Sequence, residues 1–568
     1  MASRNEVREV VCDSLGKFTL DDMGRLRRFL VLGAEGATYR PQNEAPGLGS
    51  AMALQRLIAV GRGVECVEAI VEYGSEGRCA KTDQLLFALA MCARFGDARV
   101  RTRVFEALPR VCGTPTMLFA FLEFSKALRA GAGADGGAGP RGWGRMQRRG
   151  VAGWYNGQDA LRLAQGITKY RNRKGWRHRD VLRLCHATPA SAAHAECFVH
   201  AVGAKAAKAA KAAKAAAVVE GKPDAVAAAA GRKQPAEAAL SAEDVAKREA
   251  VRAYLAAADA AIHCGAGDEA RMVELIRAHR LAREHCPTEL LGSKAVWQAL
   301  LQDMPLMAMM RNLNKMTSIG LFEGGECACT ALVVSRLSDD ALLQRARIHP
   351  FNVLLALRTY SSGRGDKGSL VWAPVRAIED ALDGAFYKCF KFLVPTGKRI
   401  MLCMDVSGSM DSPCMESSLS AREASSALAM AFLRTEPDCR LMGFCHSLVP
   451  LDFVEKNMRL DDVLSFTRDL PFGRTDCSLP MTWARENGIA VDAFVVFTDS
   501  ETNCNKVSPA QALRSYRAAT GINARLVVAA TAATQFTVAD PGDAGMLDVA
   551  GLDSAMPAII SDFIRGEL

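Results

Sequence analysis

Residues 399–410 read RIMLCMDVSGSM, and this stretch decides the fold of the C-terminal third of the chain. Its first half is a short apolar run of the kind that is buried on both faces of a parallel sheet. Similar runs follow at 440–445, 491–499 and 524–531, and helical stretches lie between them at 418–434, 479–487 and 509–519. This alternation predicts a doubly wound α/β domain over residues 367–568, with ligands beyond the carboxyl ends of its strands.

Oxygen-bearing side chains gather where these strands end. The candidate ligands are Asp405, Ser407, Ser409, Thr475 and Asp499. Carboxylate and hydroxyl oxygens suit a hard divalent cation such as Mg²⁺, and two carboxylates among neutral ligands leave a position that an acidic partner can fill. D-x-S-x-S alone also fits ordinary turns and caps. Together with Thr475 and Asp499, the pattern resembles the metal-ion-dependent adhesion site of von Willebrand factor A domains. The alternative is a domain that kept this fold and binds metal weakly.

The same serines allow a hydrolase interpretation, which the sequence disfavours. The residues around Ser407 and Ser409 do not form G-x-S-x-G, and His446 is the only histidine after residue 400. A nucleophilic serine needs a nearby base. We therefore expect a protein without enzymatic activity.

The first two thirds of the chain predict helices. Apolar residues recur at three- and four-residue spacing in 83–94, 116–128 and 293–304, which places them on one stripe of each helix. Stacked helix pairs bury such stripes against one another, so we expect an all-α array or ring of helical repeats over residues 12–366. No clean sequence period supports the repeats.

Positive charge is concentrated in one window of the chain. The whole chain of 568 residues carries a net charge of +9. Residues 141–190 hold twelve Lys and Arg against Asp159 and Asp180, a net charge of +10, so the rest of the chain is close to neutral. A field of one sign this dense attracts a polyanion, and nucleic acid is the first partner to consider. The alternative is a solvated basic face.

Two segments beside this window have unusual composition. Residues 130–142 are rich in glycine and predict a flexible loop, and an Ala/Lys-rich insertion at about 201–238 contains KAAKAAKAAK. The 18 cysteines contain no C-x-x-C pair. No signal peptide or membrane span is apparent, so we expect an intracellular protein with reduced thiols, in the cytoplasm and also in the nucleus.

Longer stretches carry a family resemblance. They are 21–33 (DDMGRLRRFLVLG), 85–92 (LLFALAMC), 167–184 (ITKYRNRKGWRHRDVLRL), 347–357 (RIHPFNVLLAL), 394–410 (VPTGKRIMLCMDVSGSM) and 473–481 (GRTDCSLPM). Over nearly its whole length the chain resembles the Ro ribonucleoprotein autoantigens. The resemblance implies a TROVE module, which is a ring of HEAT-like helical repeats closed by a von Willebrand A-like domain, in a protein that is monomeric within its ribonucleoprotein.

The resemblance also implies a function in noncoding RNA quality control. Ro proteins bind small noncoding Y RNAs on the basic outer surface of the ring and take the single-stranded 3′ end of misfolded noncoding RNAs through the central hole. By analogy, Lys169, Arg173 and His186 match family positions implicated in RNA binding. Charge alone adds Arg171, Lys174 and Arg183.

Several alternatives remain for these residues and for the function. Trp154, Tyr155 and Trp176 suit base stacking, although aromatics at helical spacing are more often core residues. His186 beside Cys185 could equally be a core histidine. A metal-dependent protein-interaction scaffold is the alternative function, and a metal-dependent nuclease is a weaker one, because the sequence offers no second carboxylate cluster.

Overall fold

The structure is a computed structural model of the chain. It describes residues 17–39, 45–76, 81–131, 143–203, 241–324, 327–365, 369–414, 419–468, 470, 474–499, 507–530, 538–551 and 555–568. These residues fall into two compact units. The sheet unit draws on Met1–Leu57, Glu76–Gln84 and Met304–Leu568, and the helical unit on Ile58–Ser75 and Leu85–Asp303.

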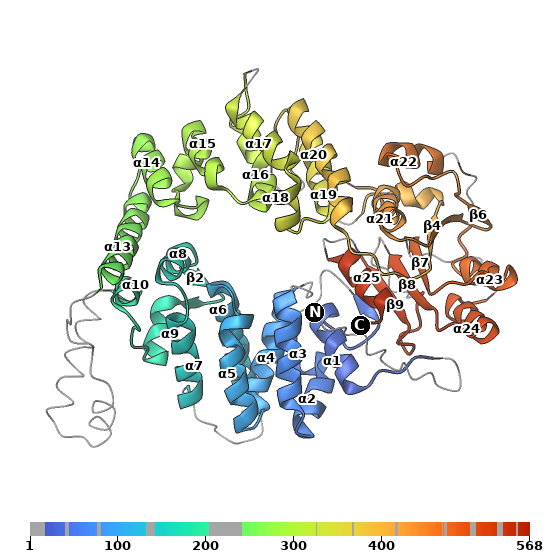
Figure 1. Ribbon diagram of the computed structural model, residues 1–568, viewed down its shortest axis with the longest axis horizontal. Helices are drawn as coiled ribbons and strands as arrows, with labels where there is room; N and C mark the ends of the chain where they lie inside the picture. Colours follow the sequence, from blue (N-terminus) through green and yellow to red (C-terminus); the bar gives the residue numbers. More distant parts are fainter. Residues whose placement is uncertain are drawn as a thin grey trace. The chain divides into compact units, whose positions relative to one another are not determined.

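The described strands of the sheet unit form one seven-stranded sheet with the order β1-β9-β8-β7-β4-β5-β6 (Figure 1). The bounds are β1 Thr38–Tyr39, β4 Ile400–Asp405, β5 Cys439–Phe444, β6 Leu448–Pro450, β7 Ala493–Thr498, β8 Arg525–Ala530 and β9 Met546–Ala550. Neighbouring strands are parallel except for β5 and β6. The predicted doubly wound α/β fold is confirmed. Strand β4 lies at the point where the chain order reverses, with β5 on one side and β7 on the other, which is where such folds bind ligands.

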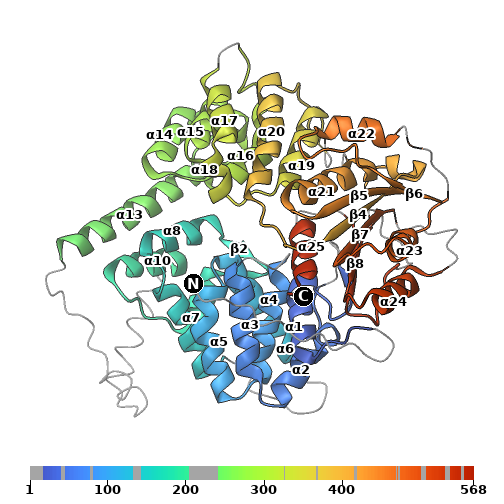
Figure 2. The ribbon, with the colours of Figure 1, turned by 45° about the vertical axis from the view of Figure 1, so that its right-hand side comes forward.

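Helices cover both faces of this sheet. They are η6 Gly408–Asp411, α21 Ala421–Thr435, α22 Leu460–Arg468, α23 Leu479–Glu486, α24 Pro509–Thr520 and α25 Met556–Arg565. Figure 2 shows α21 and α25 on one face and α23 and α24 on the other. Met401, Phe494 and Leu526 from the strands pack with Tyr516 of α24 in one buried cluster. Burial of each such side chain contributes about 1.5–3 kcal/mol, which is why apolar runs dominate these strands.

The N-terminal part of the chain also belongs to the sheet unit. Strand β1 pairs in parallel with β9, with Thr38 opposite Asp548 and Tyr39 opposite Val549. The other helices of this unit are α1 Asp22–Leu32, η1 Leu48–Ser50, most of α2 Met52–Ala59, α16 Leu306–Ser318, α17 Ala328–Ser338, α18 Asp340–Arg345, α19 Pro350–Ser361, α20 Arg376–Cys389 and η5 Phe390–Phe392. Strand β1 could not be predicted from the sequence, because two residues carry no periodicity.

The helical unit consists mainly of helices that follow one another closely. They are α3 Gly63–Glu76, α4 Thr82–Phe95, α5 Ala98–Val111, α6 Pro115–Gly131, α7 Arg145–Asn156, α8 Ala160–Lys169, α9 His178–Cys185, α10 Ala192–Val202, α13 Ala242–Ile262, α14 Glu269–His279, η3 Arg283–His285, η4 Thr288–Gly292 and α15 Lys294–Asp303. Helices α5 and α7 pack together, as do α14 and α15. The predicted helices at 83–94, 116–128 and 293–304 correspond to α4, α6 and α15.

Local sequence explains where these helices begin. The Asp97 carboxylate accepts the Val100 N–H at 2.8 Å and so caps α5, and Asp159 caps α8 through the Arg162 N–H at 2.9 Å. Each cap satisfies a backbone donor that the helix cannot satisfy itself. The helical unit also contains a short antiparallel hairpin, β2 Asn172–Arg173 and β3 Trp176–Arg177, which the sequence analysis did not predict.

Candidate nucleic-acid interface and metal centre

The β2–β3 hairpin presents the densest part of the basic window. It follows directly after α8, and Asn172 pairs with Arg177 while Arg173 pairs with Trp176. The two turn residues, Lys174 and Gly175, both have positive φ values, 51° and 76°. A tight turn of this type matches the twist of a hairpin. Glycine adopts this backbone freely, whereas lysine does so at a cost of about 1–2 kcal/mol, so the hairpin holds a strained cation at its tip.

Four of the predicted RNA-binding residues lie at this hairpin. Lys169 ends α8, and its ammonium lies 3.3 Å from Glu284. Arg171 donates to the Thr168 carbonyl at 3.0 Å and Arg173 to the Asn172 carbonyl at 2.8 Å. Lys174 is exposed in the turn. Neither guanidinium group forms an ion pair with a described residue, so these backbone contacts leave both positive charges without a described counter-charge.

The other two predicted residues lie at the far end of α9. Arg183 is exposed in its last turn, and His186 follows as the C-cap with a left-handed backbone, φ 51°. His186 is exposed, so it is not a core histidine. Because an α-helix rises about 1.5 Å per residue, Arg183 lies about 7 Å and His186 about 12 Å along α9 from its first residue, His178, which follows the hairpin. The six predicted residues therefore form two groups joined by one helix.

The aromatic residues of this region divide into core and surface. Trp154 and Tyr155 are fully buried, and the Tyr155 hydroxyl lies 2.9 Å from Nδ1 of His178, the first residue of α9. Burial lowers the pKa of His178 to about 4, so this ring is neutral. Trp176 is half-buried beside Trp143, and its indole N–H donates to Glu123. The expectation that Trp154 and Tyr155 are core residues is confirmed.

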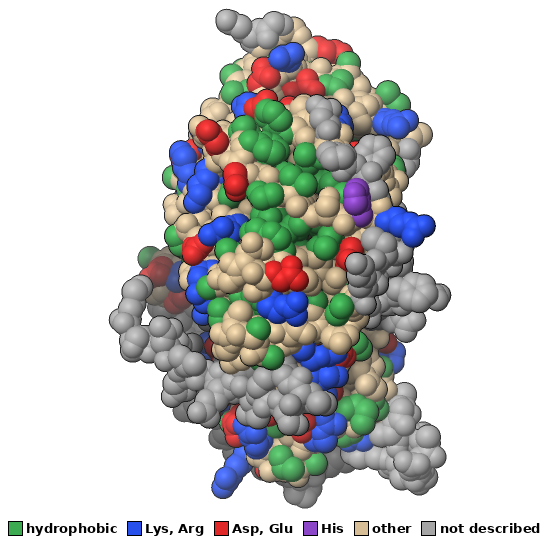
Figure 3. All heavy atoms as spheres, turned by 90° about the vertical axis from the view of Figure 1, so that its right-hand side faces the viewer, with side chains coloured by type: hydrophobic (Ala, Val, Ile, Leu, Met, Phe, Trp, Pro, Cys, Tyr) green, Lys and Arg blue, Asp and Glu red, His purple; other side chains and the backbone are tan. Residues whose placement is uncertain are grey.

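Unpaired positive charge is the main electrostatic feature of this surface. Arg171, Arg173, Arg177 and Arg183 are exposed, and none of them forms an ion pair within the described part of the chain. Arg177 was counted in the basic window but left out of the predicted site; its place in the short strand β3 could not be read from periodicity. By contrast, the face of the molecule in Figure 3 intersperses Lys and Arg with Asp and Glu. We name the surface formed by residues 169–177, Arg183 and His186 the basic surface.

Two predictions beside the basic surface fall on residues that are not described. The glycine-rich loop predicted at 130–142 lies outside the described residues except for the end of α6, and the Ala/Lys-rich insertion at 201–238 lies outside them beyond residue 203.

The candidate metal ligands lie at the carboxyl edge of the sheet. Asp405 ends β4 and is 1% exposed. Its Oδ1 accepts the Ser407 N–H at 2.8 Å and its Oδ2 accepts the Thr498 hydroxyl at 2.8 Å. The hydroxyl oxygens of Ser407 and Ser409 are 3.0 Å apart. Asp499 follows the adjacent strand β7.

Thr475 reaches the same edge from a loop. It is buried, and the next residue, Asp476, donates its N–H to the Cys445 carbonyl just after β5. The Asp476 carboxylate accepts the N–H and the hydroxyl of Ser478, so it holds this loop. The structure therefore places all five predicted ligands at the ends of three neighbouring strands or on the loops beside them.

A buried arginine supports the loop after β4. The Arg422 guanidinium donates to the Ser407 carbonyl at 3.0 Å, to the Asp411 carboxylate at 2.7 Å and to the Thr467 carbonyl at 3.2 Å. It thereby joins α21, α22 and the loop that carries both serines. Arg422 was not predicted from the sequence, because no local pattern marks an arginine that contacts the loop from the following helix.

The electrostatics of this edge fit a divalent cation. Burial raises the pKa of Asp405, hydrogen bonds from Ser407 and Thr498 oppose the rise, and the negative charge of Asp499 adds to it. Within the described residues no group of three or more His, Cys, Asp or Glu side chains could hold a metal. A cation here would need the hydroxyl oxygens, as Mg²⁺ allows. His446 contacts Cys445 Sγ at 3.3 Å, and among the described residues it has no hydrogen bond to either serine.

Comparison with known proteins covers almost the whole chain. The family model described as the TROVE domain matches residues 13–359, and that described as the Ro60 vWA domain matches residues 399–564. Two curated relatives are named RNA-binding protein RO60. The one from Caenorhabditis elegans is 36% identical over 97% of this chain and 89% of its own length, and the one from Deinococcus radiodurans is 32% identical over 97% and 94%.

A solved structure has the same fold. The crystal structure of the Deinococcus radiodurans RO (RSR) protein is similar with a TM-score of 0.80 and 31% identity, covering 96% of this chain and 100% of its own. Within the described residues, no helix is both long and apolar enough to cross a bilayer.

Proposed function

This chain belongs to the Ro60 family, and from that membership we propose that it is an RNA-binding protein of Ro ribonucleoprotein particles. In this proposal it binds small noncoding Y RNAs and captures misfolded noncoding RNAs by their single-stranded 3′ ends. The role is binding, with no bond made or broken. Relatives with the printed name RNA-binding protein RO60 support it over nearly the full chain.

The observation that carries the proposal is the charge of four arginines of the basic surface, Arg171, Arg173, Arg177 and Arg183, which form no ion pair within the described part of the chain. Exposed arginines without ion pairs in the described chain repel one another, and a phosphate backbone relieves that repulsion. Lysine and arginine release counterions when they neutralise phosphates, and exposed His186 can stack on an unpaired base. Phosphate contacts position the RNA, while its shape and an accessible single strand supply the selectivity.

A salt series tests this proposal. The purified full chain is titrated with a Y-like stem-loop RNA and with a structured RNA that has a free 3′ tail. If about five phosphates are neutralised, log affinity falls against log salt with a slope of about −4. The tailed RNA is compared with the same RNA trimmed to a blunt end, and the tail is expected to tighten binding. A flat salt response would contradict the proposal.

We also propose that Asp405, Ser407, Ser409, Thr475 and Asp499 hold a divalent cation, Mg²⁺ in the first place. The buried Asp405 carboxylate, whose pKa is raised chiefly by burial and further by the negative charge of Asp499, supports this assignment. The bound cation would supply an open coordination position for a carboxylate of a protein partner. This second function uses the sheet unit, so it is compatible with RNA binding by the basic surface.

Asp405→Asn gives a test in which two effects have opposite signs. The pKa of Asp405 is higher in the folded protein than in the unfolded chain. Between these two pKa values the folded protein therefore binds more protons than the unfolded chain does. Its free energy of unfolding falls as the pH rises through this window. The negative charge of Asp405 therefore lowers the free energy of unfolding of the metal-free protein at pH 7. We expect Asp405→Asn to raise Tm in EDTA and to abolish the rise in Tm that Mg²⁺ gives the wild type.

Thermal unfolding with EDTA and with Mg²⁺ measures both effects. Asp452→Asn is the control, because Asp452 is an exposed aspartate of the same unit outside the candidate site. It is expected to keep the Mg²⁺ shift of the wild type. An unchanged Mg²⁺ shift in Asp405→Asn would remove this residue from the metal site.

A further inference from the structure

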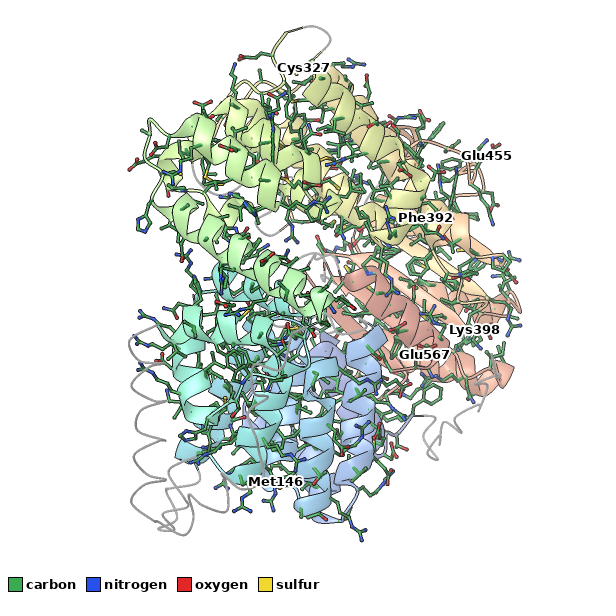
Figure 4. All side chains as sticks on the ribbon, turned by 60° about the vertical axis from the view of Figure 1, so that its left-hand side comes forward. Met146, Cys327, Phe392, Lys398, Glu455 and Glu567 are labelled. Carbon is green, nitrogen blue, oxygen red and sulfur yellow. The ribbon has the colours of Figure 1, made fainter. Side chains whose placement is uncertain are left out.

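A pair of tryptophans lies at the basic surface. Trp176 belongs to the hairpin strand β3, and Trp143 comes two residues before helix α7. Their ring centroids are 6.0 Å apart, and the ring planes are tilted by 49°. Figure 4 marks Met146, three residues after Trp143, in the first turn of α7. The contact between the two rings therefore joins the hairpin to the start of α7.

Both indole rings of this pair remain partly exposed to solvent. Within the described residues of the helical unit, the other two tryptophans, Trp154 and Trp297, are fully buried. Tryptophan has a large apolar surface, which a folded chain ordinarily buries in its core. An exposed pair of indoles in a basic region is instead suited to stacking on the unpaired bases of a nucleic acid.

A carboxylate lies at the edge of the tryptophan pair. The indole N–H of Trp176 donates to Oε2 of Glu123, on helix α6, at 3.1 Å. The Lys126 ammonium lies 3.9 Å from the same oxygen, and the Glu123 side chain is 40% exposed. The other carboxylate oxygen, Oε1, accepts no hydrogen bond from a described residue. Trp176 thus holds an ionised group that can only accept hydrogen bonds beside the two rings.

Positive charge also lies on the α7 side of the pair. Arg145, Arg148 and Arg149 are exposed and form no ion pair within the described part of the chain. The first turn of α7 holds no acidic residue, and its N-cap, Gly144, forms no side-chain hydrogen bond with the helix. The helix dipole disfavours cations at this end and favours a phosphate. An RNA strand that crosses the tryptophans therefore meets cations on both sides.

We propose that Trp143, Trp176 and Glu123 form a binding site for an unpaired guanine of the RNA. The base stacks on the exposed indole surface, and the Glu123 carboxylate accepts its N1–H and one N–H of its 2-amino group. The cations of α7 and of the hairpin contact the neighbouring phosphates. This inference rests on the proposed RNA-binding function and adds a preference for one base.

The chemistry of the carboxylate selects guanine among the four RNA bases. Only guanine carries two adjacent N–H donors on its Watson–Crick edge, which match the two oxygens of a carboxylate. The single N–H of uracil lies between two carbonyl oxygens, and adenine and cytosine place a ring-nitrogen acceptor beside their amino group. These acceptors repel the carboxylate. Glu123 also repels phosphates, so its charge weakens the binding of any RNA with which it forms no hydrogen bond.

A set of RNA tails tests this inference with the full chain. A stem-loop RNA with a 3′ tail of uridines is compared with the same RNA carrying one guanosine in the middle of the tail. We expect the guanosine to tighten binding about tenfold in fluorescence anisotropy at moderate salt. Inosine lacks the 2-amino group and is expected to lose most of this gain. Adenosine and cytidine are expected to give none.

Glu123→Gln is expected to change the two affinities in opposite directions. The guanosine preference should fall below about threefold, while the all-uridine tail should bind as tightly as before or more tightly, because a negative charge is gone. Glu106→Gln is the control. Glu106 is an acidic residue of helix α5 with a side chain that is 62% exposed, so its removal changes the net charge equally, and this variant should keep the preference.

Substitution of Trp143 tests the stacking. Trp143→Leu is expected to weaken binding of both tails about tenfold, and Trp143→Phe to retain most of the affinity, because it keeps an aromatic face. Tm measurements identify any variant that is destabilised.

The outcomes separate this inference from the proposed function. If none of the RNAs binds in a salt-dependent way, the RNA-binding function itself is wrong. If the all-uridine tail binds with the expected salt slope but guanosine adds nothing, the guanine site is wrong and the RNA-binding function stands. A guanosine preference that persists in Glu123→Gln would equally overturn the site.

Discussion

Replacing Lys169, Arg173 and His186 together by alanine is expected to weaken RNA binding at least about a hundredfold at moderate salt. Loss of a base stacked on His186 costs about 1–3 kcal/mol, and each tenfold change in affinity corresponds to about 1.4 kcal/mol. Loss of the two cations removes two phosphate contacts, so the salt slope should become shallower by about 1 for each. Equilibrium binding across the salt series measures both quantities.

The control carries the same change of composition outside the basic surface. Arg376→Ala, Lys391→Ala and His263→Ala remove two exposed cations and one exposed histidine. This variant is expected to bind RNA nearly as the wild type does. If both variants lose the same affinity, net charge alone governs binding and the assignment of the basic surface is wrong. If neither loses affinity, RNA binds elsewhere on the chain.

Asp543→Ala is expected to lower the free energy of unfolding of the sheet unit by about 3–5 kcal/mol. Asp543 is 0% exposed and receives the Arg517 guanidinium at 2.6 Å. It also accepts the N–H groups of Phe18 at 3.2 Å and Gly545 at 2.8 Å. The Phe18 ring lies 4.1 Å from the Arg517 guanidinium carbon. Removing the carboxylate takes away the counter-charge that Asp543 gives the buried Arg517 guanidinium and loosens the N-terminal segment.

Asp540→Ala is the matched control for this prediction. Asp540 lies close by in sequence and pairs with Lys17 and Arg514, but its side chain is 22% exposed. A partly exposed pair of this kind contributes less than a buried one, about 1 kcal/mol. Urea denaturation, followed by fluorescence, compares the two midpoints. Similar shifts for the two variants would mean that burial of Asp543 does not set its contribution. Arg517→Met combined with Asp543→Leu should recover part of the loss, because no buried charge is then left unpaired.

Some helices and strands could be predicted from the sequence and others could not. The apolar runs at 440–445 and 524–531 are strands β5 and β8, and the amphipathic stretch at 116–128 is helix α6. These elements were predictable because each carries its own periodicity. The β2–β3 hairpin was not predicted, since two-residue strands show no alternation. Its Lys174–Gly175 turn depends on backbone conformation that the residue types allow but do not require.

Among the residues of the candidate sites, some could likewise be predicted from the local sequence and others could not. Asp405, Ser407 and Ser409 could be predicted as candidate ligands because they end or follow one strand, and Asp499 because it follows another. Arg422 acts on the Ser407 carbonyl from helix α21 and leaves no local signal. Arg183 and His186 were grouped with the hairpin residues by charge and family resemblance, and the structure separates them by the length of α9.

The sequence by itself determined the fold class, the family and the position of the positive charge, because hydrophobic period, long motifs and net charge are all properties of contiguous residues. Only the tertiary structure decided that Thr38 and Tyr39 complete the sheet beside β9 and that Phe18 meets Asp543. It also showed which arginines form no ion pair with any described residue. Burial and pairing depend on residues hundreds of positions apart, and contacts at that separation leave no pattern in the local sequence.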